Sequence, residues 1–323
     1  MLGSICEVAD VNDLFGITYD DKFKDRVVST VEIASKCGQA LSVTEIALLL
    51  PYEIDLANIR KLIQSDPYVS VSLNMNKDIA VQKGYEYLLS EKTLRQDVSN
   101  EYLKLAETFV EQLIHRNPHM KLMGVCGSVA YGSAVKSDDI DLFLIAKKNR
   151  MWLSFLKALL LARVFRIKAS IKGEKADYCL SYVEDEKYFE EEITRQKAPL
   201  FAREFLSMHV LAGTNYYARL LNRTNWMSQI FPRLHASKIV EKSGNEIALT
   251  ENERQSSVND VLNLFIYVIL RGYLSLKAFL LNLQYRRQHK INDIFEAKIT
   301  KFSFVFTSER YRELEKIYNH LVR

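Results

Sequence analysis

The stretch GVCGSVAYGSAVKSDDIDLFLIA, from Gly124 to Ala146, places two Gly-Ser pairs and three aspartates between two apolar runs. Short apolar runs bounded by turn residues are typical of buried β-strands. A carboxylate beside such a strand is costly unless a charged group compensates it. We therefore predict strands at residues 121–126 and 140–146, joined by a turn and a short helix at 128–135, and a charged function for the aspartates.

Two of the aspartates are expected to project from one side of the second strand. Side chains alternate along a strand, so Asp139 and Asp141 share a face while Ile140, Leu142 and Leu144 share the opposite one. Two neighbouring carboxylates repel each other unless a cation lies between them. Oxygen ligands of this kind suit Mg²⁺ or Mn²⁺, which bridge carboxylates and substrate phosphates in phosphoryl chemistry.

Gly127 and Ser128 come at the point where the first strand turns into the short helix. The exposed N–H groups of such a turn form a binding site for anions, and glycine lets the backbone approach a phosphate closely. Lys136 follows in the loop, where it could reach a triphosphate or remain solvated. The stretch therefore predicts a site for a metal-bound nucleoside triphosphate.

Two-metal chemistry needs a third carboxylate, and Asp177 is the best candidate. It begins a predicted strand at 176–183, and an amphipathic helix at 151–166 is long enough to connect this strand to the previous one. Glu174 is the rival, in the turn that contains Gly173. The helix is expected to direct four apolar side chains inward, namely Trp152, Phe155, Leu159 and Leu160.

These residues resemble the signature of a known family. Its pattern is a Gly-Ser pair at a helix start, a D-x-D strand and an acidic residue on a later strand. The matching positions are Gly127-Ser128, Asp139-Ile140-Asp141 and Asp177, with Gly132 and Ser137 also in agreement. The chain thus resembles the polymerase-β-like nucleotidyltransferases over about residues 122–232. Residues 200–213 and 225–232 look like segments of uncharacterised prokaryotic members.

The resemblance implies an α+β fold with a polymerase-β-like nucleotidyltransferase core, a mixed and mostly antiparallel sheet with helices on one face. It implies an enzyme that moves a nucleoside monophosphate from a nucleoside triphosphate, ATP by default, to an acceptor and releases pyrophosphate. Asp139 and Asp141 would ligate both metal ions. Asp177 would complete the second metal site and take the acceptor's proton, while Gly127, Ser128 and Lys136 would contact the nucleotide.

The N-terminal part has the plan of a winged helix-turn-helix domain. We predict helices at 21–37, 43–50 and 56–64, then strands at 68–73 and 78–81. DNA binding is not favoured, because the third helix offers only Arg60 and Lys61. Residues 1–90 also contain 8 basic and 13 acidic residues, whereas the remainder contains 36 and 27. This acidic balance opposes binding to phosphates, so a docking module is favoured.

The predicted organisation has three parts. Residues 1–92 form the winged-helix-like domain, 93–235 the catalytic domain with a bridging helix at 94–116, and 236–323 a helical C-terminal region. Residues 236–252 are a polar linker, and long helices follow at 256–284 and 308–322. The apolar run 261–270 is too short to span a membrane and predicts a buried helix, so no membrane span is expected.

The cysteines indicate a reducing environment. Cys6, Cys37, Cys126 and Cys179 are far apart and form no C-x-x-C pair, which is typical of isolated thiols. The N-terminal residues lack a basic segment followed by an apolar one, so no signal peptide is expected. We predict a cytoplasmic protein.

Several questions stay open at this point. The acceptor could be an RNA 3′ end held by the basic segment 285–290, a protein hydroxyl, or a small molecule. The runner-up function is a catalytically silent winged-helix regulator or nucleotide sensor. Arg203 and Glu204 could pair on a helix surface, or Arg203 could contact the nucleotide, and Tyr131 is expected to pack in the core. The apolar face of residues 261–283 could form an interface, although the sequence does not decide the oligomeric state.

Overall fold

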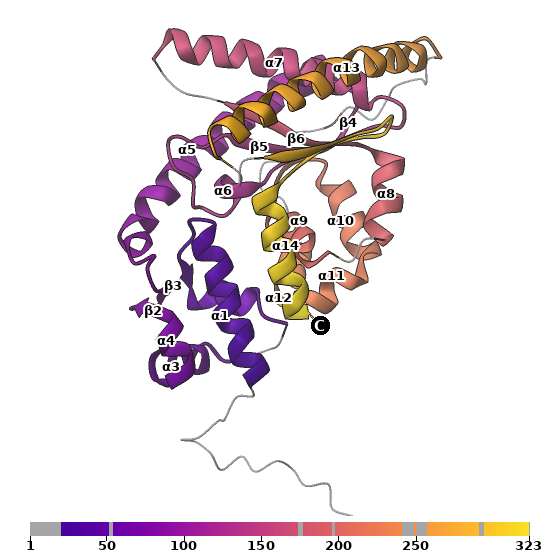
Figure 1. Ribbon diagram of the computed structural model, residues 1–323. Helices are drawn as coiled ribbons and strands as arrows, with labels where there is room; N and C mark the ends of the chain where they lie inside the picture. Colours follow the sequence, from indigo (N-terminus) through magenta and orange to yellow (C-terminus); the bar gives the residue numbers. More distant parts are fainter. Residues whose placement is uncertain are drawn as a thin grey trace, which may run out of the picture.

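The computed structural model (Figure 1) describes residues 21–51, 54–173, 177–195, 198–240, 249, 257–290 and 294–322. A six-stranded mixed sheet forms the centre of this part of the chain, and helices cover both of its faces. A three-stranded sheet with short helices around it lies in the N-terminal part. The α+β class and the mixed sheet are therefore confirmed.

The N-terminal module is built around a small antiparallel sheet with the strand order β1-β3-β2. Its second helix starts after Ser42, where a capping box forms. The Glu45 N–H donates to the Ser42 hydroxyl, and the Ser42 N–H donates to the Glu45 carboxylate over 2.6 Å. The elements are α1 (Asp21–Lys36), β1 (Leu41–Ser42), α2 (Val43–Leu48), α3 (Leu56–Ser65), α4 (Pro67–Ser72), β2 (Leu73–Asn76) and β3 (Ile79–Gln82).

Residues 67–72 form the helix α4, so the strand predicted at 68–73 is wrong. Pro67 begins this helix, and the Asp66 carboxylate accepts hydrogen bonds from the N–H groups of Tyr68 and Val69. An aspartate cap followed by proline is a strong start signal for a helix and outweighs the alternating pattern of YVSVSL. The hairpin consequently begins only at Leu73, after four helices instead of three.

The central sheet has the strand order β7-β4-β5-β6-β9-β8. Its strands β5 and β6 are parallel and are connected by the helix α7 (Met151–Ile171), whereas the other neighbouring pairs are antiparallel. This agrees with the predicted crossover between the two strands that carry the aspartates. The strands are β4 (Met120–Val125), β5 (Ile140–Ala146), β6 (Tyr178–Asp185), β7 (His209–Ala212), β8 (Phe295–Ile299) and β9 (Ser303–Ser308).

Helices pack on both faces of this sheet, where the resemblance implied one face only. On β5, Phe143 and Ile145 join one hydrophobic cluster, and Leu142 and Leu144 join another on the opposite face. A strand buried in both directions needs an apolar layer on each side. One layer consists of α5 (Tyr87–Arg116), α7 and α13 (Ser257–Arg287). The other consists of α8 (Glu186–Arg195), α9 (Pro199–Ser207), α10 (Thr214–Arg223), α11 (Asn225–Ile230), α12 (Pro232–Val240) and α14 (Glu309–Val322).

The C-terminal region, predicted to be helical, also contributes the β8–β9 hairpin to the central sheet. Strand β9 pairs with β6, so that Val183 lies opposite Phe304. Phe304 packs against the rings of Trp152 and Phe155 on α7. The Ser303 hydroxyl donates a 2.7 Å hydrogen bond to the buried Glu184 carboxylate. The hairpin therefore closes one side of the sheet through contacts between segments far apart in the sequence.

The apolar run 261–270 lies in α13, and its predicted burial is wrong. Ile266 and Leu270 pack against the core, whereas Phe265 and Val268 are each 62% exposed. Among the described helices, α13 is the one long and apolar enough to cross a membrane, a test that core helices of soluble proteins also pass. Leu160 of α7, which was expected to face inward, is exposed as well.

The N-terminal module packs against α14 and the helices beside it. Side chains of α1, α2 and α3 share one hydrophobic cluster with those of α9, α12 and α14. Arg233 of α12 donates to the carbonyl of Ile54, and Arg310 of α14 donates to the carbonyl of Lys36. The module is thus in direct contact with the layer of helices below the central sheet (Figure 1).

Candidate active site

The Gly-Ser turn and the D-x-D strand meet at the ends of β4 and β5. Gly127 starts the one-turn helix α6 (Gly127–Ala130) with a left-handed φ of +65°. A Cβ atom at this position would clash with Asp141 Oδ2, and the Cys126 N–H donates to the Asp141 carbonyl over 2.9 Å. Glycine is favoured here because the left-handed backbone strains other residues and a side chain would press on the adjacent carboxylate.

Asp141 lies in β5 as predicted, and its carboxyl group is strongly perturbed. Burial raises its pKa from 3.8 to about 7, and the negative charges of Glu204, Asp139 and Asp138 act in the same direction. A hydrogen bond with the Cys179 thiol partly offsets this shift. Carboxylates gathered in this way are typical of functional sites, because a bound cation would relieve their repulsion.

Asp139 and Asp177 lie side by side at the start of β5 and β6. The Ile140 N–H donates to the Asp177 carbonyl over 2.8 Å, and Ile140 pairs with Tyr178 in the parallel register. The Asp139 side chain is exposed. The Asp177 carboxylate forms an ion pair with Arg166 of α7, with Nε and Oδ1 separated by 3.0 Å. Asp177 thus lies at the start of the strand next to that of Asp139, and its carboxylate is paired with Arg166 of its own chain.

The remaining predicted residues lie in the connection between α6 and β5. The Ser128 carbonyl accepts the Ser133 N–H, which closes the turn. The Lys136 carbonyl accepts the Tyr102 hydroxyl over 2.8 Å, while the Lys136 residue itself is exposed. The Asp138 carboxylate accepts a 3.1 Å hydrogen bond from the Val135 N–H and stabilises the loop. Glu174 lies outside the described residues.

Glu204 is a site residue that the sequence did not assign. Its carboxylate accepts a 2.7 Å hydrogen bond from the Tyr131 hydroxyl and a further hydrogen bond from the Gly127 backbone. Burial raises its pKa, and both hydrogen bonds and the charge of Arg203 counteract the rise. Glu204 therefore binds in this structure the same Gly127 N–H that was predicted to face a phosphate. The signal available in the sequence was a charged pair inside the apolar helix segment PLFAREFL.

Arg203 is buried, so the surface-pair interpretation is wrong. Its guanidinium donates to Gln39 Oε1 over 2.9 Å and to the Tyr318 hydroxyl over 2.7 Å, and it stacks on Tyr131 at 4.8 Å from the ring centre. Gln39 belongs to the N-terminal module and Tyr318 to α14. The buried Arg203 guanidinium, next to Glu204 in the sequence, thus connects three segments that are far apart in the chain and contain Gln39, Tyr131 and Tyr318.

The cysteines near the site, Cys126 and Cys179, lie in surroundings that favour the protonated thiol. Burial raises the pKa of both Cys126 and Cys179, and the neighbouring Asp141 charge raises them further. Thiols in such surroundings stay protonated and unreactive at neutral pH. The carboxylates are consequently the charged groups of this site.

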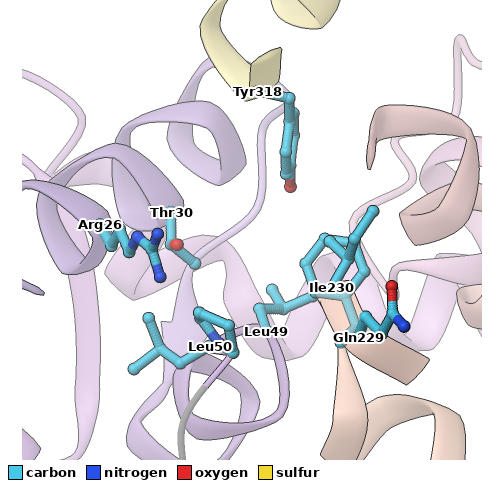
Figure 2. Close-up of a pocket in the computed structure, with 9 residues that line it drawn as sticks. Arg26, Thr30, Leu49, Leu50, Gln229, Ile230 and Tyr318 are labelled. Atoms are coloured by element: carbon cyan, nitrogen blue, oxygen red, sulfur yellow. The ribbon is translucent and has the colours of Figure 1, made fainter. Parts of the chain in front are cut away.

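The pocket shown in Figure 2 lies away from these carboxylates. It has a volume of about 110 Å³ between α1, the end of α2 and α11, and it includes Arg26, Thr30, Ile230 and Tyr318. Tyr318, which points into the cavity, is its link to the Arg203 cluster. None of the predicted site residues lines the pocket, so it does not identify the substrate site.

The donor set fits a divalent cation in its chemistry but is incomplete as a two-metal site. Asp139 and Asp141 supply hard oxygen atoms in surroundings with excess negative charge, as Mg²⁺ requires. No cluster of three or more His, Cys, Asp or Glu side chains in the described ranges is arranged to hold a metal ion. The pair therefore fits a metal in its chemistry, whereas no third side chain in the described ranges completes a metal-binding group with it.

Comparison with protein-family models, with curated proteins and with solved structures finds no match to this chain.

Proposed function

We propose that the protein is a metal-dependent nucleotidyltransferase that moves a nucleoside monophosphate from a nucleoside triphosphate to an acceptor. The observation that supports this most is the contact between the two halves of the motif. Gly127 leaves room for the Asp141 carboxylate, so that the turn proposed to bind phosphate and one aspartate of the pair proposed to bind metal lie at one corner of the sheet. Structural stability alone gives no reason to place several carboxylates there.

In the proposed reaction, an acceptor oxygen bonds to the α-phosphorus, the bond to the bridging oxygen of the β-phosphate breaks, and pyrophosphate leaves. Asp139 and Asp141 would hold Mg²⁺ or Mn²⁺, which neutralises charge on the phosphates when bound. Gly127 and Ser128 would orient the triphosphate. Asp177 would accept the acceptor's proton, for which it must exchange its ion pair with Arg166.

The runner-up function is a catalytically silent regulator that binds a nucleotide. Two observations favour it: Glu204 accepts a hydrogen bond from the Gly127 backbone, and no group of three or more His, Cys, Asp or Glu side chains in the described part of the chain could hold a metal ion. A phosphate would have to displace Glu204 from Gly127. Glu204 neighbours Arg203, and Arg203 donates a hydrogen bond to Gln39 of the N-terminal module. Displacement of Glu204 would therefore alter the contact between Arg203 and this module.

The acceptor stays open between RNA, a protein hydroxyl and a small molecule. The basic segment at the end of α13 is exposed at Arg286, Arg287 and Lys290, as contact with RNA phosphates would require. DNA binding by the N-terminal module remains unfavoured, because Arg60 of α3 is paired with Asp78 over 2.6 Å. We propose ATP as the nucleoside triphosphate by default.

The test is transfer of label from the α-phosphate of each of the four nucleoside triphosphates, with Mg²⁺ or Mn²⁺. The protein is incubated alone, with total cellular RNA, and with cell lysate. Transfer by the wild type that disappears in the Asp139→Asn/Asp141→Asn variant would support the proposal and reveal the acceptor class. The matched control is Glu107→Gln/Glu111→Gln, which removes two exposed carboxylates from α5. Nucleotide binding without any transfer, in folded protein, would instead favour the regulator.

A further inference from the structure

The outer side of α13 carries exposed apolar side chains that nothing in the described part of the chain covers. Phe265, Val268, Leu276 and Phe279 are 62%, 62%, 59% and 63% exposed. They lie opposite the side of the helix on which Leu270 packs into the core. Surfaces of this kind on soluble proteins mark interaction sites, since they are costly to leave in water.

The exposed apolar residues are arranged symmetrically about Gly272, the middle residue of α13 (Ser257–Arg287). Phe265 and Phe279 lie seven positions before and after it, and Val268 and Leu276 lie four positions before and after it. The outer pairs Leu264 with Leu280 and Val261 with Leu283 continue the pattern, and all four are exposed. Two copies of α13 that cross antiparallel at Gly272 would place each residue opposite its counterpart.

Gly272 is exposed on the same stripe. Apart from its own helix backbone and chain neighbours, no described residue has an atom within 4 Å of where its Cβ atom would lie. A glycine inside a helix costs about 1 kcal/mol relative to alanine. At a helix crossing, however, glycine lets the two helices approach closely. The position of Gly272 at the centre of the stripe therefore indicates a helix that packs on it from outside.

We propose that α13 is the interface of a homodimer in which two copies of the helix pack antiparallel across a two-fold axis at Gly272. A two-fold interface pairs a surface with itself, which is what the symmetric stripe provides. The proposal does not depend on the proposed catalytic function.

The exposed apolar area of the stripe is large enough for a second copy of the chain to pack on it. Eight apolar side chains, more than half exposed on average, present on the order of 800 Å² per copy, close to what each partner buries in a standard interface. A membrane would not require symmetry about Gly272. It would also have to accommodate Arg271 and Lys277 in the middle of the helix, where charges are costly.

The first test is sedimentation velocity of the full chain over about 1 to 100 µM, the range in which a micromolar dimer dissociates. The wild type should dimerise, and Gly272→Leu should weaken dimerisation at least about tenfold while remaining folded by circular dichroism. Its control is Glu107→Leu, which adds a leucine to an exposed position outside α13. A wild type that stays monomeric, or a Gly272→Leu variant that dimerises normally, would overturn the proposal.

The second test addresses the antiparallel register. Phe265→Glu and Phe279→Lys should each weaken the dimer, and the double variant should restore it, because Glu and Lys then face each other twice. A double variant no better than either single one would contradict this register. The same proteins are floated with vesicles of equal phosphatidylglycerol and phosphatidylcholine. If the protein is monomeric and binds these vesicles through α13, the proposal is overturned, and a membrane surface, not a second copy, covers the apolar stripe.

Discussion

Replacement of Asp141 by asparagine should stabilise the protein at alkaline pH while it abolishes nucleotidyl transfer. The carboxyl group is held against Gly127 and near Glu204, Asp139 and Asp138, and its pKa is raised to about 7. Above that pH the folded protein carries a partly buried charge close to other negative groups. An asparagine at this position would keep the shape of the side chain without its charge.

The magnitude follows from proton linkage. A carboxyl group whose pKa is 3.8 when unfolded and about 7 when folded holds its proton more tightly in the native state. Stability therefore falls as pH rises from about 4 to about 7 and then levels off. The full difference corresponds to about 4 kcal/mol, of which about 2 to 3 kcal/mol appears between pH 5 and pH 8. Asp141→Asn removes this dependence, so its advantage in unfolding free energy should grow by that amount.

The assay is urea unfolding of wild type, Asp141→Asn and Glu107→Gln at pH 5, 6, 7 and 8 without divalent metal. Glu107 is exposed on α5, so its variant should differ little from wild type and serves as the control. In a second arm at pH 8, Mn²⁺ should raise the midpoint of thermal unfolding of the wild type and leave Asp141→Asn unchanged. An Asp141→Asn variant that is less stable than wild type at pH 8, or equally stable at every pH, would refute this reasoning.

Three further predictions concern the neighbouring residues. Gly127→Ala should lower the free energy of unfolding by about 1 to 3 kcal/mol and reduce any transfer activity. The control is Gly84→Ala, which should lose less stability because Gly84 also has a positive φ but no side chain lies close to it. Equal losses of the two variants in urea unfolding would contradict the contact of Gly127 with Asp141. Arg203→Met should lower the free energy of unfolding by about 3 to 5 kcal/mol, because the hydrogen bonds to Gln39 and Tyr318 are lost and the buried Glu204 carboxylate loses its neighbouring positive charge. A variant that unfolds at the same temperature as wild type would show that the cluster does not stabilise the protein. Glu184→Gln should stabilise the protein by about 1 to 3 kcal/mol above pH 7 and little at pH 5, since burial raises the pKa of this carboxyl group to about 7; unfolding curves measured at the two pH values test the sign.

Much of the central architecture could be predicted from local patterns. The strand β5 was predicted with the observed bounds, because IDLFLIA is a continuous apolar run that begins beside a carboxylate. The parallel crossover through α7 and the capping box at Ser42 likewise follow from short stretches of sequence. Where the prediction failed, as at α4, two local signals competed and the cap at Asp66 prevailed.

Contacts between distant segments could not be predicted in the same way. The β8–β9 hairpin pairs with β6, a strand more than a hundred residues earlier, and no local pattern specifies that partner. The same applies to Arg203, whose burial depends on hydrogen bonds to Gln39 and Tyr318. The exposure of one side of α13 is also a property of the assembled fold, because its apolar composition alone predicts burial.

The sequence by itself determined the two strands on either side of the Gly-Ser turn and the place of Asp141 in the second of them. These are local consequences of strand alternation and backbone sterics. Only the tertiary structure decided that Glu204 lies on Gly127, that Asp177 is held by Arg166, and that a symmetric apolar stripe faces outward on α13. Each of these depends on which surfaces remain once the core is packed, and that is set by the whole chain at once.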